Sequence, residues 1–491
     1  MNANKSAMRI LAKETAIYGL SSIIGKFLNW LLVPLYTYVL AREADYGIVT
    51  NLYAWTALLL VLLTYGMETG LFRFANRDDY DSQSVYKTAF MTLLMTSSLF
   101  LIAVIVFRQP IAALLGYAGH PEFIAMMFAT VAIDAFASIP FAYLRYQKRA
   151  IHFAALKLLF VVLNIGFNIL FLVILGKNDV FYVFLSNILA TGIQTLVLLP
   201  LTMPKGGHFD RSILRSMLKY SLPLLVLGVA GIMNQTLDRI LFPYLYVGED
   251  AQTQLGIYGA CFKVAMVMMM FTQAFRYAYE PFVFSKHKDK QSVEAYADAM
   301  KYFLIFSYLI LLGMVFYLDI LKFIIARSYW SGLRIVPIVL WTYIFQGVYF
   351  NLSFWYKLTD RTQWGAWFSL IGVFITFLLQ VLFVPRYGYM ASALSGTVCY
   401  LVIMLLSYFI GQHYLPVPYD KRAIGRYTLL TIVLLGIYYA VRAWVPVHTM
   451  SISMAVGTVL LVIYLTVLVR RDFPLSQLPL IGKYFATKQP S

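Results

Sequence analysis

Long apolar runs are the feature of this sequence that most limits its fold. A bilayer core requires about 20 mostly apolar residues per helix, because every backbone polar group must be satisfied inside the segment. The chain contains about fourteen runs of that length, separated by short polar segments. They lie at residues 15–40, 46–72, 85–107, 121–144, 153–176, 180–200, 220–246, 254–284, 302–325, 333–356, 364–384, 389–411, 426–445 and 450–469. We therefore predict an all-α integral membrane protein.

The composition agrees with this prediction and argues against metal chemistry. Of the 491 residues 61% are apolar and 12% are charged, whereas soluble domains carry about a quarter charged residues. The two cysteines, Cys261 and Cys399, both lie in apolar runs, and the six histidines are never in ligand spacing. We expect neither a disulfide framework nor a metal site.

The basic residues of the chain follow the loops. The net charge is +17, and with the N-terminus inside, the inner segments hold roughly three times as many lysines and arginines as the outer loops. Lysine and arginine are enriched in cytoplasmic loops. We therefore predict an even helix count with both termini cytoplasmic, and no binding of nucleic acid.

The sequence repeats itself after about 210 residues. The matches are Pro34 with Pro243, Gly47 with Gly256, Arg149 with Arg361, and Gly176 with Gly388. A repeat of six helices is even in number, so the two copies cross the membrane in the same direction and form parallel lobes. The predicted organisation is an N-terminal lobe (1–202), a cytoplasmic linker (203–219), a C-terminal lobe (220–412), and two extra helices with a tail (413–491), with a central cavity between the lobes.

Charged and amide side chains inside the predicted spans are the candidate functional residues. A charge at membrane depth costs roughly 2.5–3.5 kcal/mol on insertion scales, and such residues normally face a bundle interior or a watery cavity. The candidates for binding a diphosphate or glycan are Lys26, Asn29, Arg73, Asn234, Arg239, Lys263, Gln273 and Arg276. The candidate charge partners, or sites for coupling to sodium or protons, are Glu68, Asp134, Asp238 and Glu280.

Helical spacing groups several of these side chains on common faces, and each group has a structural alternative. Asn234 and Asp238 are one turn apart, as are Arg276 and Glu280. Asp238 with Arg239 or Lys263 could be a buried pair that joins two helices. Arg276 and Glu280 could pair within their helix or extend toward the inner surface. Arg73 lies near an inner end, where it could serve as a topology anchor. Lys26 is deep and has no acidic neighbour in its own helix, which favours a functional role.

Several short motifs resemble those of polysaccharide flippases of the O-antigen type, in the same order along nearly the whole chain. They are Val33-Pro34-Leu35-Tyr36-Thr37, Asp45-Tyr46-Gly47, Gly70-Leu71-Phe72-Arg73-Phe74, Leu222-Pro223, Asp238-Arg239, Gln273-Ala274-Phe275-Arg276, Glu280-Pro281-Phe282, Ile335-Val336-Pro337, Trp355-Tyr356-Lys357-Leu358-Thr359 and Pro385-Arg386-Tyr387-Gly388-Tyr389. The resemblance implies the multidrug/oligosaccharidyl-lipid/polysaccharide flippase superfamily.

The resemblance also implies a fold, a location and a substrate. The fold is two six-helix lobes around a V-shaped cavity, with two extra helices, in the bacterial cytoplasmic (inner) membrane. Transport is by alternating access, without catalytic residues or a cofactor, and the substrate is a polyprenyl-diphosphate-linked oligosaccharide such as an O-antigen unit of lipopolysaccharide. By position, Lys26, Arg239, Lys263 and Arg276 would engage the diphosphate. The partners implied are membrane lipids and other polysaccharide-assembly proteins.

Two other functions compete with the flippase. An ion-coupled multidrug exporter of the same superfamily would prefer an acidic cavity, whereas bases predominate here. A membrane enzyme that uses a lipid-linked glycan donor would call for a large outer loop or a cluster of acids and histidines. The predicted outer loops are short, and the one after the seventh helix offers only Glu249 and Asp250.

Overall fold

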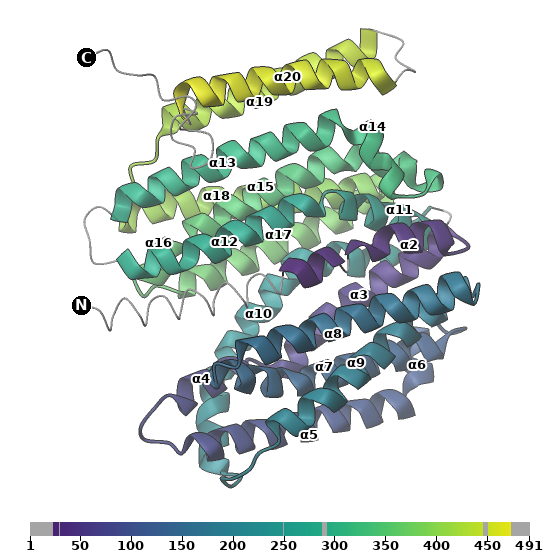
Figure 1. Ribbon diagram of the computed structural model, residues 1–491, viewed down its shortest axis with the longest axis vertical. Coiled ribbons are helices and arrows are strands. Elements are labelled where there is room, and N and C mark those ends of the chain that lie inside the picture. The colour runs from purple at the N-terminus through teal and green to yellow at the C-terminus, as the bar shows by residue number, and fades with distance from the viewer. Residues whose placement is uncertain (1–22, 29, 249, 287–291, 445–449, 473–491) are drawn as a thin grey trace. The chain divides into compact units, whose positions relative to one another are not determined.

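The structure is all-helical over the residues that it describes. The computed structural model describes residues 23–28, 30–248, 250–286, 292–444 and 450–472, and every regular element among them is a helix (Figure 1). Within these residues 12 helices are long and apolar enough to span a membrane, and a bent helix pair brings the number to 13. The first predicted run, 15–40, is described only in part, as the shorter apolar helix Ile23–Val39. The chain is a multi-pass membrane protein, and its count of fourteen spans depends on that first run.

The helices of the first half of the chain follow the predicted spans closely. They are α2 (Leu32–Val39), α3 (Glu43–Thr64), α4 (Met67–Ala75), α5 (Ser82–Val106), α6 (Arg108–Leu114), α7 (Pro121–Tyr146), α8 (Ala150–Asn168) with the π-helical turn η1 (Ile169–Ile174), and α9 (Val180–Thr202). Asp81 and Asp179 cap α5 and α9, since their carboxylates accept hydrogen bonds from the first backbone N–H groups.

The second half of the chain is also built of helices. It comprises α10 (Arg211–Leu245), α11 (Ala251–Val264), α12 (Met266–Lys286), α13 (Ser292–Phe316), α14 (Leu318–Leu321), η2 (Lys322–Ile324), η3 (Arg327–Ile335), α15 (Val336–Leu352), α16 (Phe354–Leu358), α17 (Gln363–Tyr387), α18 (Tyr389–Tyr414), α19 (Lys421–Trp444) and α20 (Met450–Arg471). The helix predicted at 302–325 lies earlier in the chain, as α13.

The predicted linker at 203–219 is non-helical only over 203–210. Helix α10 begins inside the predicted linker, at Arg211, because the Asp210 carboxylate accepts hydrogen bonds from the backbone N–H groups of Ser212 (2.6 Å) and Ile213 (3.3 Å). The start of this helix was not predicted, because the segment is basic and its hydropathy is low. At 35 residues, α10 is about 52 Å long and exceeds the hydrocarbon core.

The described chain divides into two compact units. One comprises residues 1–282 and 325–415, and the other 283–324 and 416–491. In the second unit α13 packs on α19 and α20, where the Tyr464 hydroxyl donates to the Ile305 carbonyl (2.8 Å) and Tyr308 bonds Thr428 (2.8 Å). The boundaries of the predicted lobes stay a prediction.

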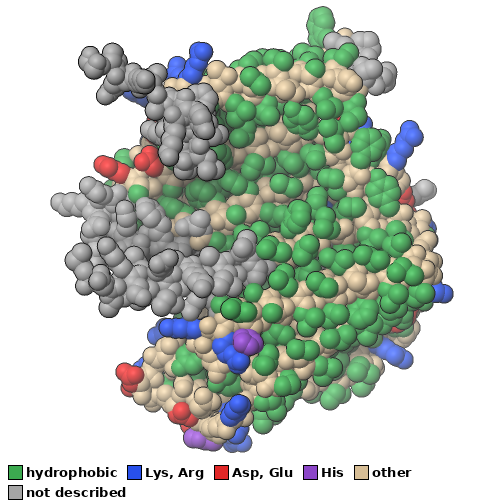
Figure 2. Space-filling model, viewed as in Figure 1, with side chains coloured by type: hydrophobic (Ala, Val, Ile, Leu, Met, Phe, Trp, Pro, Cys, Tyr) green, Lys and Arg blue, Asp and Glu red, His purple; other side chains and the backbone are tan. Residues whose placement is uncertain are grey.

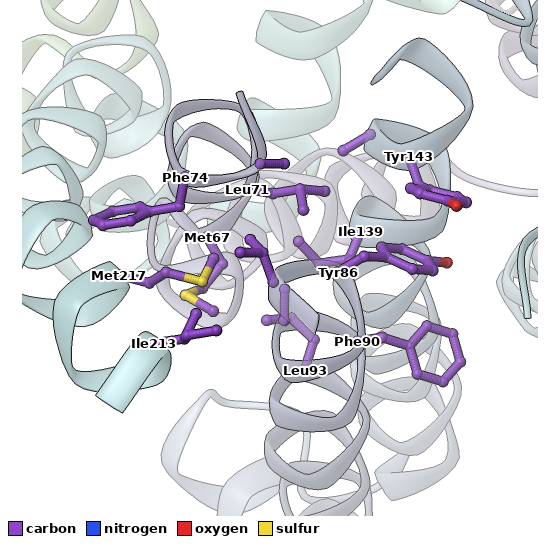
Figure 3. Packing of buried hydrophobic residues seen from close by; sticks show 14 of the residues in the cluster. Met67, Leu71, Phe74, Tyr86, Phe90, Leu93, Ile139, Tyr143, Ile213 and Met217 are labelled. Carbon is purple, nitrogen blue, oxygen red and sulfur yellow. The ribbon is translucent and has the colours of Figure 1, made fainter. Parts of the chain in front are cut away.

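The predicted span 46–72 consists of two helices, because the backbone turns at Tyr65 and Gly66, both with positive φ (30° and 71°). Gly66 lies directly on α10, where the Ser221 hydroxyl donates to its carbonyl (3.1 Å). The turn directs α4 onto α5 and α10, and side chains of all three helices meet in a buried apolar cluster that includes Met67, Leu71 and Met217 (Figure 3).

Apolar side chains also cover the outer surfaces of the helices. Hydrophobic residues are spread over most of the visible face in Figure 2. Leu99, Phe374 and Val459 are 69%, 64% and 60% exposed. A soluble protein would rarely leave apolar patches of this extent open to water, so these surfaces face lipid.

The two copies of the sequence repeat meet at a glycine crossing in the first unit. A Cβ on Gly47 of α3 would lie 1.9 Å from the Gln252 carbonyl oxygen of α11, and a Cβ on Gly256 would lie 2.0 Å from the Glu43 carbonyl oxygen of α3. Gly47 and Gly256 are one of the pairs that define the repeat. Equivalent positions of the two copies therefore pack backbone to backbone, which only glycine allows.

We predict that Gly47→Ala destabilises the protein by about 1–3 kcal/mol or more, because the added methyl group forces α3 and α11 apart. The effect is measured as the apparent Tm in detergent, determined by size-exclusion chromatography of heated samples. Gly192→Ala is the matched control, since a Cβ there meets no atom within 4 Å. A Tm for Gly47→Ala equal to or above that of Gly192→Ala would contradict the crossing.

Candidate functional site

A cavity of about 290 Å³ lies inside the first unit and is lined by both copies of the repeat. Helices α2, α3, α8 and α9 contribute to it from the first copy, and α10 and α11 from the second. Its polar side chains include Tyr53, Asn164, Asn187, Arg239 and Lys263. A space of this size with a few converging polar groups is typical of a ligand site.

A second cavity of about 230 Å³ adjoins the first. It is lined by residues of α3, α10, α11, α12, α15, α17 and α18, and its polar side chains include Asn234, Asp238 and Gln346. Ala57, Thr236, Arg239 and Phe262 line both spaces. We refer to the two together as the central cavity. Arg239 stands where they meet.

The guanidinium of Arg239 is held on several sides. Its Nε lies 3.4 Å from Asp238 Oδ1, and a terminal nitrogen donates to the Gln235 carbonyl. The guanidinium carbon lies 4.6 Å from the centre of the Phe262 ring, a cation–π distance. The buried Asp238–Arg239 pair considered above is thus present, and it forms within α10 and does not join two helices.

The backbone of Arg239 is fixed by a hydrogen-bond chain that the sequence analysis missed. Asn51 of α3 donates to the Arg239 carbonyl (2.7 Å) and accepts from the Tyr117 hydroxyl (2.8 Å), to which Gln252 donates in turn (3.3 Å). Burial raises the pKa of the Tyr117 phenol well above its ordinary value, so the phenol stays a donor. The one usable sequence signal was an asparagine at 51 within an otherwise apolar span.

Lys263 is the freest cation of the central cavity. It occupies the last turn of α11, just before the chain bends by 45° into α12. Its carbonyl accepts a hydrogen bond from the Trp30 indole (2.8 Å). Its ammonium lines the cavity and makes no hydrogen bond or ion pair with a described residue.

A second group of basic residues lies apart from the central cavity. The Lys26 ammonium donates to Gln273 Oε1 of α12 (2.6 Å), and Arg276 lies near enough to repel it electrostatically. The Arg276 guanidinium is 5.4 Å from the centre of the Phe350 ring. None of Lys26, Gln273 and Arg276 is among the residues that line the central cavity. The structure thus separates the predicted binding residues into two groups.

Asn234 belongs with Arg239 and Lys263 in the group that lines the central cavity, whereas Arg73 belongs to neither group. Asn234 lines the central cavity and donates to the Ser369 carbonyl (3.0 Å). Arg73 is exposed at the end of α4, with its guanidinium 4.2 Å from the centre of the Tyr220 ring. Asn29 and the side chain of Glu280 lie outside the described residues.

The predicted acids of the first half lie between the helices of that half. Glu68 forms an ion pair with Arg145. Asp134 of α7 makes no hydrogen bond or ion pair with a described residue, although the Lys157 charge acts on it. The Lys157 ammonium lies 3.9 Å from the centre of the Phe141 ring. Lys157 lies within α8, inside the predicted span 153–176.

The fold is that of a membrane flippase or transporter. Over 92% of this chain and 98% of the other, it resembles the lipid II flippase MurJ in an inward closed conformation, with a TM-score of 0.73 and 13% identity. It also resembles an inward-facing multidrug resistance MATE family transporter of the MOP superfamily, with a TM-score of 0.63 and 13% identity, over 81% of this chain and 97% of the other. These neighbours are transporters and flippases rather than enzymes.

A further structural neighbour is a MOP superfamily transporter from Pyrococcus furiosus, described as having a binding pocket of reverse polarity. Its TM-score is 0.54 at 14% identity, over 82% of this chain and 95% of the other. No curated protein matches in sequence. The family model described as polysaccharide biosynthesis protein matches residues 11–281. The chain belongs to that family, in agreement with the motifs noted in the sequence.

We predict that a cysteine in the central cavity reacts with anionic thiol reagents in preference to cationic ones. Ala57→Cys, with Cys261 and Cys399 replaced by alanine, places a thiol where both spaces meet. For each variant the reaction rate of the sulfonate methanethiosulfonate is divided by that of the trimethylammonium reagent. We expect this ratio to be about 10-fold higher at Ala57→Cys than for a small thiol in solution, because fixed cations in a cleft concentrate anions.

Leu99→Cys is the control for this labelling, since Leu99 faces outward from α5 in the apolar surface. There we expect little reaction with either charged reagent. Equal relative rates for the two reagents at Ala57→Cys, or an unreactive thiol, would contradict a basic, water-filled cavity.

Proposed function

We propose that this protein flips a polyprenyl-diphosphate-linked oligosaccharide from the inner to the outer leaflet of a bacterial cytoplasmic membrane, by alternating access. The observation that carries the proposal is the Lys263 ammonium, which lines the central cavity beside Arg239 without an acidic partner among the described residues. A buried cation is normally paired. We therefore propose that an anionic substrate pairs with the Lys263 ammonium.

The two cations of the central cavity suit a diphosphate in different ways. Arg239 is held in place and offers a planar array of donors that matches phosphate oxygens. Lys263 is a compact charge on a flexible stem. Together they could neutralise both phosphate groups in a space that holds a head group rather than a whole glycan chain.

Lys26 and Arg276 provide a second place for the same head group. The Trp30 indole donates to the carbonyl of Lys263, at the end of α11. One turn before Trp30, the Lys26 ammonium donates to Gln273, which lies later in the chain, in α12. With the N-terminus in the cytoplasm, this second group lies on the cytoplasmic side of the central cavity. A diphosphate that enters from the inner leaflet would meet Lys26 and Arg276 first and Arg239 with Lys263 next.

The charge of the central cavity disfavours export of cationic drugs. Among the described residues that line it, the one carboxylate is that of Asp238, which is already engaged by Arg239 and by the Tyr258 hydroxyl (2.6 Å). A cationic guest would face two fixed positive charges. We propose an O-antigen type glycan as the cargo on the strength of the family, and Asp134 as a candidate for coupling to protons or sodium.

Replacement of the Lys263 charge tests the proposal. In vesicles that contain a fluorescent diphosphate-linked glycan, we expect Lys263→Gln to slow flipping by about 10-fold, because a charge-assisted hydrogen bond contributes about 1.5–3 kcal/mol. Lys263→Arg, which keeps the charge, should retain most of the rate.

Lys177→Gln provides the matched control, since Lys177 is exposed in the loop between η1 and α9. It removes the same charge outside the cavity and should leave flipping unchanged. If well-folded Lys263→Gln flips the glycan at the rate of the unaltered protein, the central cavity is not the diphosphate site.

A further inference from the structure

The two oxygens of the Asp238 carboxylate contact different residues. Tyr258 of α11 is 1% exposed, and its hydroxyl donates to Asp238 Oδ2 at 2.6 Å. The other oxygen, Oδ1, lies 3.4 Å from Arg239 Nε. Each carboxylate oxygen is thus engaged by a different residue, and the ion pair is single and long.

The contact between Asp238 and Arg239 is weaker than the strongest pairing of a carboxylate with an arginine. A carboxylate with both oxygens available binds an arginine through two parallel hydrogen bonds, which is the strongest geometry for that pair. Such a pair would occupy one edge of the guanidinium and cancel its charge at short range. Because Tyr258 holds Oδ2, Asp238 touches Arg239 only at Nε, and the guanidinium keeps donors for a ligand in the central cavity.

We infer that Tyr258 is a positioning residue for anion binding, which acts through Asp238 to keep Arg239 available to the substrate diphosphate. The inference rests on the function proposed above. It assigns a role to a residue on α11, whose partner carboxylate is on α10, so the packing of these two helices sets the affinity of the cavity for phosphate.

Tyr258→Phe tests the inference, since it removes the hydroxyl and keeps the ring. In the vesicle assay with the fluorescent diphosphate-linked glycan, we expect the apparent KM to rise about fivefold, while the maximal rate changes by less than about twofold. Arg239→Lys, which keeps a charge but loses the guanidinium donors, should raise the apparent KM on its own. Tyr258→Phe should then add no further rise in the Arg239→Lys background.

Tyr464→Phe is the control for loss of a buried phenol bond. The Tyr464 hydroxyl donates to the Ile305 carbonyl (2.8 Å) in the second unit, and neither residue lines the central cavity. This variant should lower the apparent Tm as Tyr258→Phe does, with an unchanged KM.

The outcomes separate this inference from the proposed function. If Arg239→Lys raises the KM but Tyr258→Phe alone does not, Tyr258 has no positioning role. Equal rises from Tyr258→Phe with and without Arg239→Lys would also overturn it, because the hydroxyl would then act independently of the guanidinium. If neither Arg239→Lys nor Lys263→Gln affects flipping, the diphosphate site itself is elsewhere.

Discussion

The cost of a charge without a partner in a low-dielectric interior is the constraint on which this site depends. A membrane span accepts a lysine or arginine only where water, an acid or an anion meets it. Arg239 satisfies this condition within the protein, through Asp238, the Gln235 carbonyl and the Phe262 ring. Lys263 makes no hydrogen bond or ion pair with a described residue, and it lines the central cavity. The proposed affinity of the cavity for anions rests on this difference between the two cations.

Contacts between the two copies of the repeat fix the helices around Arg239. Gly47 and Gly256 bring α3 and α11 into backbone contact, and Asn51, one turn further along α3, bonds the Arg239 carbonyl. Hydrogen bonds between the two copies of the repeat therefore hold the helices that line the cavity. An arginine whose main chain is fixed in this way can present its side chain to a ligand with little reorganisation.

Much of the fold was predictable from the sequence, because spans and loops differ sharply in hydropathy. The apolar runs matched most helices to within a few residues. However, α13 lies well before its predicted run at 302–325, and elsewhere a strong local signal overruled hydropathy. Asp210 starts α10 early by capping it, and Tyr65 with Gly66 divides a continuous apolar run. Asn164 and Asn168 are one helical turn apart in the sequence, and their side chains form a hydrogen bond (3.2 Å).

The candidate site was predictable residue by residue but not as an arrangement. Depth in a span identified Lys26, Arg239, Lys263 and Arg276, yet it could not show that they form two groups. That division depends on which helix each long side chain reaches, as Lys26 does with Gln273. The supporting residues Tyr258 and Tyr117 carry no charge and stand among many tyrosines, so only tertiary contacts distinguish them.

The most direct test of the central claim is a structure of this protein in nanodiscs with a short polyprenyl diphosphate. We expect density for the diphosphate between Arg239 and Lys263, with phosphate oxygens within about 3 Å of the guanidinium and ammonium nitrogens. A diphosphate that lies elsewhere in the chain, with the Lys263 ammonium still facing only water, would contradict it.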